Sequence, residues 1–396
     1  MKKIKMNKVI FSVLVMSVFV ACKKKGCTDE TAVNYTENAK KDDGSCEYAE
    51  VISRGIEAPS TYKFERNGAS TVSFSGQKER MDMLSEMVAY MKTANTPGTA
   101  LDEAKMLNMY ANENTPFIAA ELNASSKQLK DKTASSDPLI IGEIENWIKE
   151  IASISDSTEV AKFEGKSGNS GVVQSGDKAY LVNKLGQEPT QIIEKGLVGA
   201  VFMHQISYVY LGAEKMNLDN DIIEEGQSYT KMEHHWDEAF GYLFGTVDFP
   251  AEGTDRFWGK YANGRNDLLA SNTKLMNAFI AGRFAITQLD YAARDAQISI
   301  IRMELEKVCA ATAIHYLSLA KKEISDDALR NHAISEAWAF LDNLKYAYEG
   351  KLTSAQIAEH KKTIGEDFYS ISAANLTSVI DDLATTYGFE SIKSQL

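Results

Sequence analysis

The sequence predicts a mostly α-helical protein, built as a duplicated helical bundle with a small irregular or β-structured part at the N-terminus. Apolar residues recur at helical spacing over much of the chain. The 396 residues include only six prolines, and none follows Pro250. Because proline interrupts helices, this distribution favours long helices over a β-sandwich with many turns. An apolar content of 44% is enough for one large core or a few smaller ones.

The charge balance excludes one class of partner. Lysine and arginine number 43 against 55 aspartates and glutamates, which gives a formal net charge of −12. A surface of this sign repels polyanions, so we expect no nucleic acid partner.

Residues 1–21 have the pattern of a signal peptide. Four lysines precede an apolar run from Val9 to Ala21, and this run is shorter than the roughly 18 residues that a membrane-spanning helix needs. The sequence Phe19-Val20-Ala21-Cys22 resembles a bacterial lipobox, which implies cleavage before Cys22 and lipidation of that cysteine. The alternative is a signal peptide cut elsewhere.

Lipidation at Cys22 implies a location in the cell envelope, as an outer membrane lipoprotein that faces the periplasm or the exterior. Removal of the four lysines changes the net charge to −12 − 4 = −16. Anionic lipid repels so acidic a body, so we expect the acyl chains to provide the contact with the membrane.

Residues 22–49 form a short polar segment with few side chains able to build a core. The segment contains Cys27 and Cys46. In an exported chain, a disulfide between them would contribute on the order of 3 kcal/mol, so we predict this pairing. The runs Cys27-Thr28-Asp29 and Asp42-Asp43-Gly44-Ser45-Cys46 resemble a small module of bacterial surface proteins, which implies exposure at the cell exterior.

One helical domain is predicted over residues 50–390. Its first part, residues 50–76, has the composition of extended chain around a turn at Asn67-Gly68, and helical periodicity follows from Met81 to Met91. Asp137-Pro138 is typical of a helix start. Glycines between residues 164 and 190 interrupt helicity and leave Ala179–Val182 as a short strand. The remaining predicted helices span residues 190–215, 228–245, 266–323, 326–348, 354–364 and 372–387.

The segment 266–323 is too long for one straight helix. At 1.5 Å per residue it would reach about 87 Å, which exceeds the size of a domain of this length. We therefore predict a break near Asp290–Asp295.

Five of the six histidines belong to a pattern that occurs twice, at about residues 190–250 and 305–350. Each copy begins with a histidine-bearing apolar helix. A second helix follows, with the form His-x-x-x-Glu-Ala-aromatic-small-aromatic-Leu. Duplication of a helical hairpin explains the pattern. The first copy contains His204, His234, His235 and Glu238, and the second contains His315, His332 and Glu336.

Two interpretations of these residues remain open. At 100° per residue, His234 and Glu238 share one face of their helix, opposite its aromatic residues, and the second copy projects in the same way. In one interpretation the imidazole and carboxylate groups bind iron or another divalent metal. In the other, each glutamate accepts a hydrogen bond from a buried histidine. His235 has no counterpart in the second copy, and it favours the metal site.

The run His235-Trp236-Asp237-Glu238 resembles the His-x-x-Glu core of the imelysin-like proteins. These are all-α bacterial lipoproteins built from two related helical bundles and linked to iron acquisition. Residues 50–390 also resemble an uncharacterised branch of these lipoproteins, classed as a domain of unknown function. Glu233 departs from the fuller imelysin motif, which has glycine at that position. The segments that carry the resemblance to the branch are Thr61–Arg66, Val72–Gln77 and Lys195–Ala200.

This resemblance implies an envelope lipoprotein that binds iron or an iron-bearing ligand and works with an iron-uptake receptor system. A surface scaffold protein with structural His–Glu pairs is the alternative. A metallopeptidase is a third possibility. The zinc peptidase motif, with two histidines one turn apart and a glutamate between them, is missing from the sequence, so we do not expect catalysis. The expected metal ligands are His235 and Glu238, followed by His234, His204, His315, His332 and Glu336.

Overall fold

The computed structural model describes residues 24–29, 32, 34–41, 45–46, 58–156, 167–250 and 255–396. The chain divides into two units, Met1–Glu50 and Val51–Leu396. The predicted signal peptide and the predicted lipidation site at Cys22 lie outside the described residues. Within the described ranges, every helix is too short or too polar to span a bilayer.

The N-terminal unit is closed by a disulfide between Cys27 and Cys46, which confirms the predicted pairing. Cys27 is fully buried, and its carbonyl oxygen accepts a hydrogen bond from the Thr36 amide at 3.0 Å. The Asn34 side chain donates to the carbonyl oxygen of Ser45, next to the disulfide. A covalent link and polar contacts therefore order a segment that is too short and too polar to build a large apolar core.

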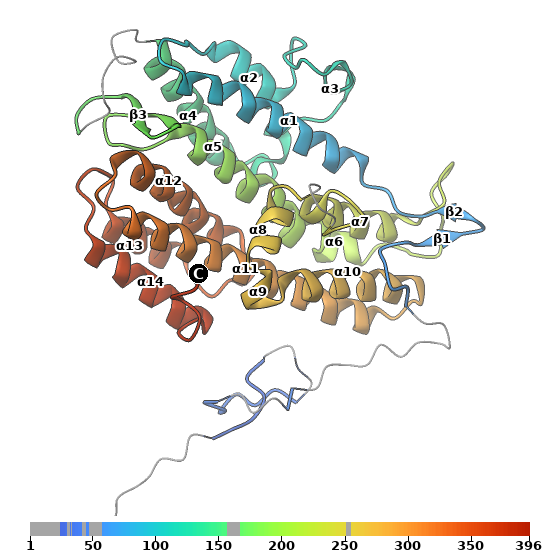
Figure 1. Cartoon of the computed structure of the whole chain (residues 1–396). Helices are drawn as coiled ribbons and strands as arrows, with labels where there is room; N and C mark the ends of the chain where they lie inside the picture. Colours follow the sequence, from blue (N-terminus) through green and yellow to red (C-terminus); the bar gives the residue numbers. More distant parts are fainter. Residues whose placement is uncertain are drawn as a thin grey trace, which may run out of the picture. The chain divides into compact units, whose positions relative to one another are not determined.

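The second unit is mostly helical, as the sequence predicts (Figure 1). Its described strands form two antiparallel hairpins, β1 (Glu65–Arg66) with β2 (Ala69–Ser70) and β3 (Gly171–Ser175) with β4 (Lys178–Val182). The α-helices are α1 (Ser75–Lys92), α2 (Glu103–Ala111), α3 (Ala120–Ala124), α4 (Pro138–Asp156), α5 (Pro189–Leu197), α6 (Ala213–Met216), α7 (Lys231–Phe244), α8 (Trp258–Gly264), α9 (Asn266–Leu269), α10 (Ser271–Thr287), α11 (Tyr291–Lys322), α12 (Asp327–Asn343), α13 (Ser354–Ile364) and α14 (Ala373–Tyr387). Shorter helical segments are the 3-10 turns η1 (Thr93–Asn95), η2 (Lys130–Ser135) and η6 (Leu344–Tyr346) and the π-helical η4 (Val198–Met203) and η5 (Gln205–Tyr210).

The long segment 266–323 is interrupted between Thr287 and Asp290, where Asp290 caps a new helix. Helix α10 ends at Thr287, and Leu289 adopts a left-handed conformation with φ of 58°. The Asp290 side chain then accepts a hydrogen bond from the Ala293 amide and caps the start of α11. The chain therefore reverses at the N-terminal edge of the predicted break. In Figure 1, α10 and α11 lie side by side along the lower part of the second unit.

Helix α5 lies between the first and the last helices of the unit. It contacts α1 and α4 on one side and α12 on the other, and Figure 1 shows it between the blue-green and the orange helices. Helix α12 in turn packs against α11, while α7 packs against α1, α10 and η5. Helices α7 and α12, which carry five of the seven predicted ligands, are therefore interior elements of the bundle.

Residues 189–216 differ from the single regular helix predicted over 190–215. Helix α5 continues into η4 and η5, in which the hydrogen bonds have the wider π-helical spacing, and α6 follows after Gly212. At Gly199 the chain passes close to α12, because a Cβ atom there would lie 1.9 Å from Oδ1 of Asn343. The Asn343 side chain donates to the carbonyl oxygen of Lys195 at 2.9 Å. The contact between η4 and α12 therefore depends on the missing side chain of Gly199.

Candidate functional site

Helix α7 carries the first group of predicted ligands, and local hydrogen bonds determine where it begins. The Thr230 side chain accepts a hydrogen bond from the Glu233 amide, and the Glu233 carboxylate accepts one from the Thr230 amide. This capping box starts the helix at Lys231. One turn then separates His234 from Glu238, which places them on the same face.

Three of the predicted ligands, His234, His235 and Glu238, lie together on α7, and we call them the α7 group. Nδ1 of His235 donates a hydrogen bond to Oε2 of Glu238 at 2.7 Å, and Nε2 of His234 lies 3.9 Å from Oε1 of Glu238. The side chains of His234 and Glu238 are 30% and 16% exposed, so the group lies just below the surface. Nδ1 of His234 has no hydrogen-bond partner among the described residues.

The surroundings set the charges of this α7 group. Burial lowers the pKa of His234, although the Glu238 carboxylate opposes that effect. Burial would raise the pKa of Glu238, but the hydrogen bond from His235 and the neighbouring His234 lower it below its usual value. At neutral pH the group thus combines a neutral His234 imidazole with an ionised carboxylate, which are the protonation states of metal ligands.

Three further residues surround the α7 group, and none of them belongs to the histidine and glutamate pattern of the sequence. Gln77 of α1 donates to Oε1 of Glu238 at 2.9 Å, and its amide nitrogen lies 3.4 Å from the Tyr210 hydroxyl of η5. The Tyr229 ring stacks on His234 with their centroids 4.6 Å apart. Only the fold brings these residues together. One signal was present in the sequence, because Gln77 ends a segment that carries the family resemblance.

A buried ionic network adjoins the α7 group. Arg283 of α10 is fully buried and donates to Asp237 and to Glu233, each at 3.0 Å. Arg66 of β1 makes two further hydrogen bonds to Glu233, at 2.9 and 3.0 Å. The Tyr62 hydroxyl donates to Asp237 at 2.6 Å. These bonds join the segment before α1 to α7 and α10, and they fix the position of α7 in the bundle.

The network also gives Glu233 a structural role, at the position where the imelysin motif has glycine. The Glu233 side chain is 2% exposed and serves the helix cap, Arg66 and Arg283 at once. Although burial would raise its pKa, the hydrogen bond from Arg66 and the charge of Arg283 lower it. A glycine at this position would leave Arg283 with one carboxylate partner fewer in the protein interior.

Helix α12 places His332 between the carboxylates of Glu188 and Glu336, and we call these three residues the α12 group. Nδ1 of His332 donates to Oε2 of Glu188 at 2.6 Å, and its Nε2 lies 3.4 Å from Oε2 of Glu336. The ring of Tyr180 in β4 stacks on the imidazole with a centroid distance of 4.2 Å. Nζ of the buried Lys195 lies 3.4 Å from Oε1 of Glu336. Lys195 belongs to the third segment of the family resemblance, and Tyr180 to the predicted strand.

The charges of this α12 group compensate one another. Burial would lower the pKa of His332, but Glu188 and then Glu336 raise it above its ordinary value. Burial would also lower the pKa of Lys195, which Tyr261 and Glu194 raise well above its ordinary value. Cationic groups thus face the carboxylates in an enclosed space, which agrees with the interpretation of structural His–Glu pairs.

The other two histidines among the predicted ligands, His204 and His315, lie apart from both groups. Nδ1 of His204 is 3.4 Å from the Ser135 hydroxyl, and the ring stacks on Tyr208. Nδ1 of His315 donates to the carbonyl oxygen of Leu396 at 2.6 Å. Burial lowers the pKa of both histidines. Neither hydrogen-bonds to a carboxylate of the α7 or the α12 group in the described residues.

The seven predicted ligands therefore form two groups and two single residues. Lys195 contacts the α12 group and Tyr210 the α7 group, and 15 residues of helical chain, roughly 20 Å, separate them. In the part of the chain that the structure describes, no three His, Cys, Asp or Glu side chains have the geometry of a formed metal site. His234, His235 and Glu238 fit a metal by donor type, but Glu238 is already hydrogen-bonded to His235.

Comparison with known proteins supports the second of the two resemblances. A family model described as "Domain of unknown function (DUF4856)" matches residues 59–390. No curated protein and no solved structure matches the chain. The matched region includes both repeat copies and the three segments that carry the resemblance, while the link to imelysins stays a prediction. The chain belongs to the DUF4856 family.

Proposed function

We propose that the protein is a lipid-anchored protein of the cell envelope that binds iron(II), or a similar divalent metal, through His234, His235 and Glu238. The proposal rests on the convergence of these three side chains just below the surface of α7. Two imidazoles and one carboxylate form the ligand set of many non-haem iron(II) sites.

The residues around the site have definite roles in this proposal. Metal capture requires Glu238 to release the hydrogen bond from His235, which lies at 2.7 Å. Gln77 donates to the same carboxylate and keeps it oriented. Because an imidazole must be neutral to bind a metal, the affinity falls in acid as the histidines become protonated, and burial moves this step for His234 below its ordinary pKa of about 6.5.

The proposed role is uptake rather than catalysis. The anchor predicted at Cys22 would hold the protein at the outer membrane, facing either the periplasm or the exterior. An iron-uptake receptor system would then receive the metal. A carrier must bind its metal reversibly. In this proposal Glu238 exchanges its hydrogen bond with His235 for a bond to the metal and re-forms it on release.

A second candidate function is a non-enzymatic binding or scaffold protein. The α12 group supports it, because His332 and Lys195 already neutralise the carboxylates that surround them. In this case the hydrogen-bonded pair of His235 and Glu238 is structural as well. The protein would then bind a partner through other residues of its surface.

Metal titration separates the two candidates. The protein is purified without chelator, and anaerobic iron(II) and zinc are titrated into wild type and into a His235→Ala, Glu238→Ala double variant. We expect about one metal per wild-type chain and an affinity at least 10- to 100-fold lower in the variant. The matched control is His332→Gln, Glu336→Gln, which makes a comparable change in the second copy and should retain wild-type affinity.

Circular dichroism and thermal melts establish that each variant is folded. Equal metal uptake by wild type and by the folded α7 variant would remove the metal site and leave the scaffold function. Loss of uptake in the α12 variant alone would place the site in the other copy.

A further inference from the structure

A tyrosine hydroxyl lies beside the α7 group. Tyr210 is the last residue of the π-helical segment η5, which packs against α7, and π-helical turns are frequent at functional sites. The side-chain nitrogen of Gln77 lies 2.9 Å from Oε1 of Glu238 and 3.4 Å from the Tyr210 hydroxyl, so one amide holds both oxygen atoms. The centroid of the Tyr210 ring lies 5.9 Å from that of His235. A phenol oxygen therefore adjoins the imidazoles and the carboxylate.

The carboxylate of the α7 group has no lysine or arginine partner. Among the described residues, the ion-pair partners of Glu238 are His234 at 3.9 Å and His235 at 2.7 Å. On α12, by contrast, Nζ of Lys195 lies 3.4 Å from Oε1 of Glu336. A metal ion at Glu336 would meet an ammonium group of the same sign, whereas a metal ion at Glu238 would not.

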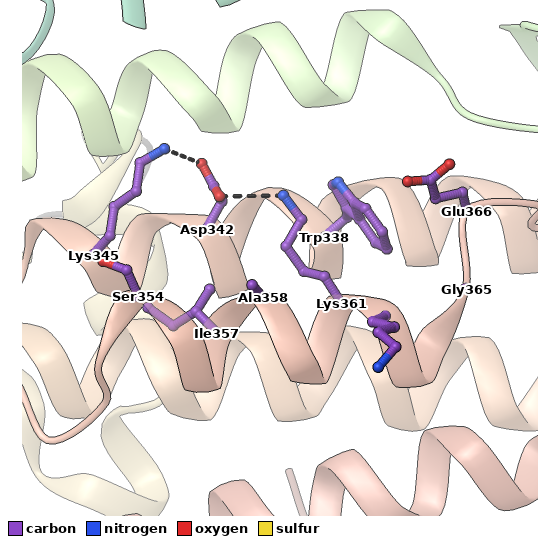
Figure 2. A pocket seen from close by; sticks show the side chains of 10 residues that line it. Trp338, Asp342, Lys345, Ser354, Ile357, Ala358, Lys361, Gly365 and Glu366 are labelled. Carbon is purple, nitrogen blue, oxygen red and sulfur yellow. Dashed lines mark hydrogen bonds and ion pairs between the residues drawn. The ribbon is translucent and has the colours of Figure 1, made fainter.

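The groove between α12 and α13 shows the same contrast. Asp342 in its lining lies 2.6 Å from Nζ of Lys345 and 3.2 Å from Nζ of Lys361, as Figure 2 shows. A metal ion would have to displace these ammonium groups to reach the carboxylate. Neither α12 nor this groove therefore offers a carboxylate as open to a metal as that of Glu238.

The Tyr210 hydroxyl is held as a neutral phenol. Burial raises the pKa of this hydroxyl, and Tyr242 and then Glu238 raise it further. The charge of Arg80 opposes this effect, and Arg80 is itself 3.7 Å from Asp131. A metal that binds the phenol oxygen must therefore displace its proton to solvent. Iron(III) carries one more charge than iron(II) or zinc and gains more from an anionic oxygen ligand.

We propose that Tyr210 is a fourth ligand of the metal site and that its phenolate oxygen enables the site to hold iron(III). This inference rests on the proposed function, because His234, His235 and Glu238 supply the other ligands. Phenolate is a known ligand of iron in proteins. Its bond to iron(III) gives a visible charge-transfer band, which zinc and iron(II) do not give. The band therefore reports ligation by a tyrosine.

Visible spectroscopy of the full chain during addition of iron(III) nitrilotriacetate tests the ligation. We expect a charge-transfer band that saturates at about one iron per chain. Tyr210→Phe should lose this band and bind iron(III) at least about tenfold more weakly, because it lacks the anionic oxygen. The same variant should bind zinc as wild type does, since zinc leaves the phenol protonated.

Tyr316→Phe is the matched control in the second copy. Burial raises the pKa of the Tyr316 hydroxyl, and Glu336 raises it further, so this tyrosine also adjoins a glutamate. Lys195 faces that glutamate, however, and we expect the variant to keep the band and the iron(III) affinity of wild type. Circular dichroism and thermal melts establish that both variants are folded.

The outcomes separate this inference from the proposed function. Zinc binding that depends on His235 and Glu238, without a band on addition of iron(III), would refute ligation by Tyr210 and leave the metal site in place. A band of wild-type intensity in Tyr210→Phe, or its loss in Tyr316→Phe alone, would also overturn the inference. Absence of both zinc binding and the band would remove the metal site itself.

Discussion

At the scale of single residues, the polar groups inside the bundle divide into those that the fold needs and those that remain available. Arg283 and Asp237 are fully buried and satisfy each other. His234, by contrast, is partly exposed, and its Nδ1 has no partner among the described residues. The available groups gather at the α7 site because the neighbouring network already holds the helix in place.

The buried network gives the first prediction. Arg283→Met should lower the free energy of unfolding by about 3 to 5 kcal/mol, because it leaves the buried Asp237 carboxylate without its cation and leaves Glu233 with Arg66 alone. Urea unfolding followed by circular dichroism measures the change. Arg256→Ala is the control, since its pair with Asp82 is partly exposed and should contribute less than about 1 kcal/mol. Equal losses in the two variants would contradict the structural role of the network.

His332 and His204 should change the stability of the fold in opposite directions as the pH changes. Because Glu188 raises the pKa of His332 against the effect of burial, protonated His332 stabilises the fold below a pH of about 6.5, and this contribution disappears as the pH rises through the folded-state pKa. Burial lowers the pKa of His204, so its neutral form is favoured and stability is lost as the pH falls.

Urea unfolding of His332→Gln and His204→Gln at pH 5.5 and pH 8 measures this difference. The destabilisation by His332→Gln relative to wild type should be larger at pH 5.5 than at pH 8. The destabilisation by His204→Gln should instead be smaller at pH 5.5. The same pH trend in both variants would show that the carboxylates do not act on His332 as the distances indicate.

At the level of helices and strands, capping residues in the local sequence determine where a helix begins. The way in which two helices pack against each other depends instead on residues far apart in the sequence. Thr353 caps α13 and Asp290 caps α11, and residues of this type at these positions are visible in the sequence. The short helices α2, α3 and α8 have too few turns to show a period in the sequence. The sequence predicts a regular helix over η4 and η5, whereas the structure has π-helical segments there that pack against α7 and α12.

Gly199 provides the prediction for this scale. Gly199→Ala would place a Cβ atom 1.9 Å from Oδ1 of Asn343. We expect a loss of about 1 to 3 kcal/mol in the free energy of unfolding, because η4 must move away from α12. Gly142→Ala is the control on α4, where a Cβ atom meets nothing within 4 Å. It should stabilise the protein by about 0.5 to 1 kcal/mol, since alanine favours the helix. A destabilised Gly142→Ala, or an unchanged Gly199→Ala, would contradict this account.

At the scale of the whole molecule, the chain joins a small disulfide-closed unit to a large helical one. The larger unit contains the matched family region, both groups of predicted ligands and the groove between α12 and α13. Three sequence segments carried the family resemblance, and each supplies contacts to a ligand-bearing helix. Tyr62, Gln77 and Lys195 reach Asp237, Glu238 and Glu336.

The helical class, most helix positions and the disulfide can be predicted from the sequence, because periodicity, capping residues and cysteine spacing are local properties of the chain. The family follows from the resemblance of three segments and from the family match over residues 59–390. The sequence also places histidine and glutamate one turn apart on α7 and α12. The groups that these pairs face depend instead on how distant parts of the chain pack together. Glu188 lies 144 residues before its partner His332, and Gln77 lies 161 residues before Glu238. The fold therefore separates a compensated group on α12 from a more open group on α7, since the charges that surround each histidine come from distant helices.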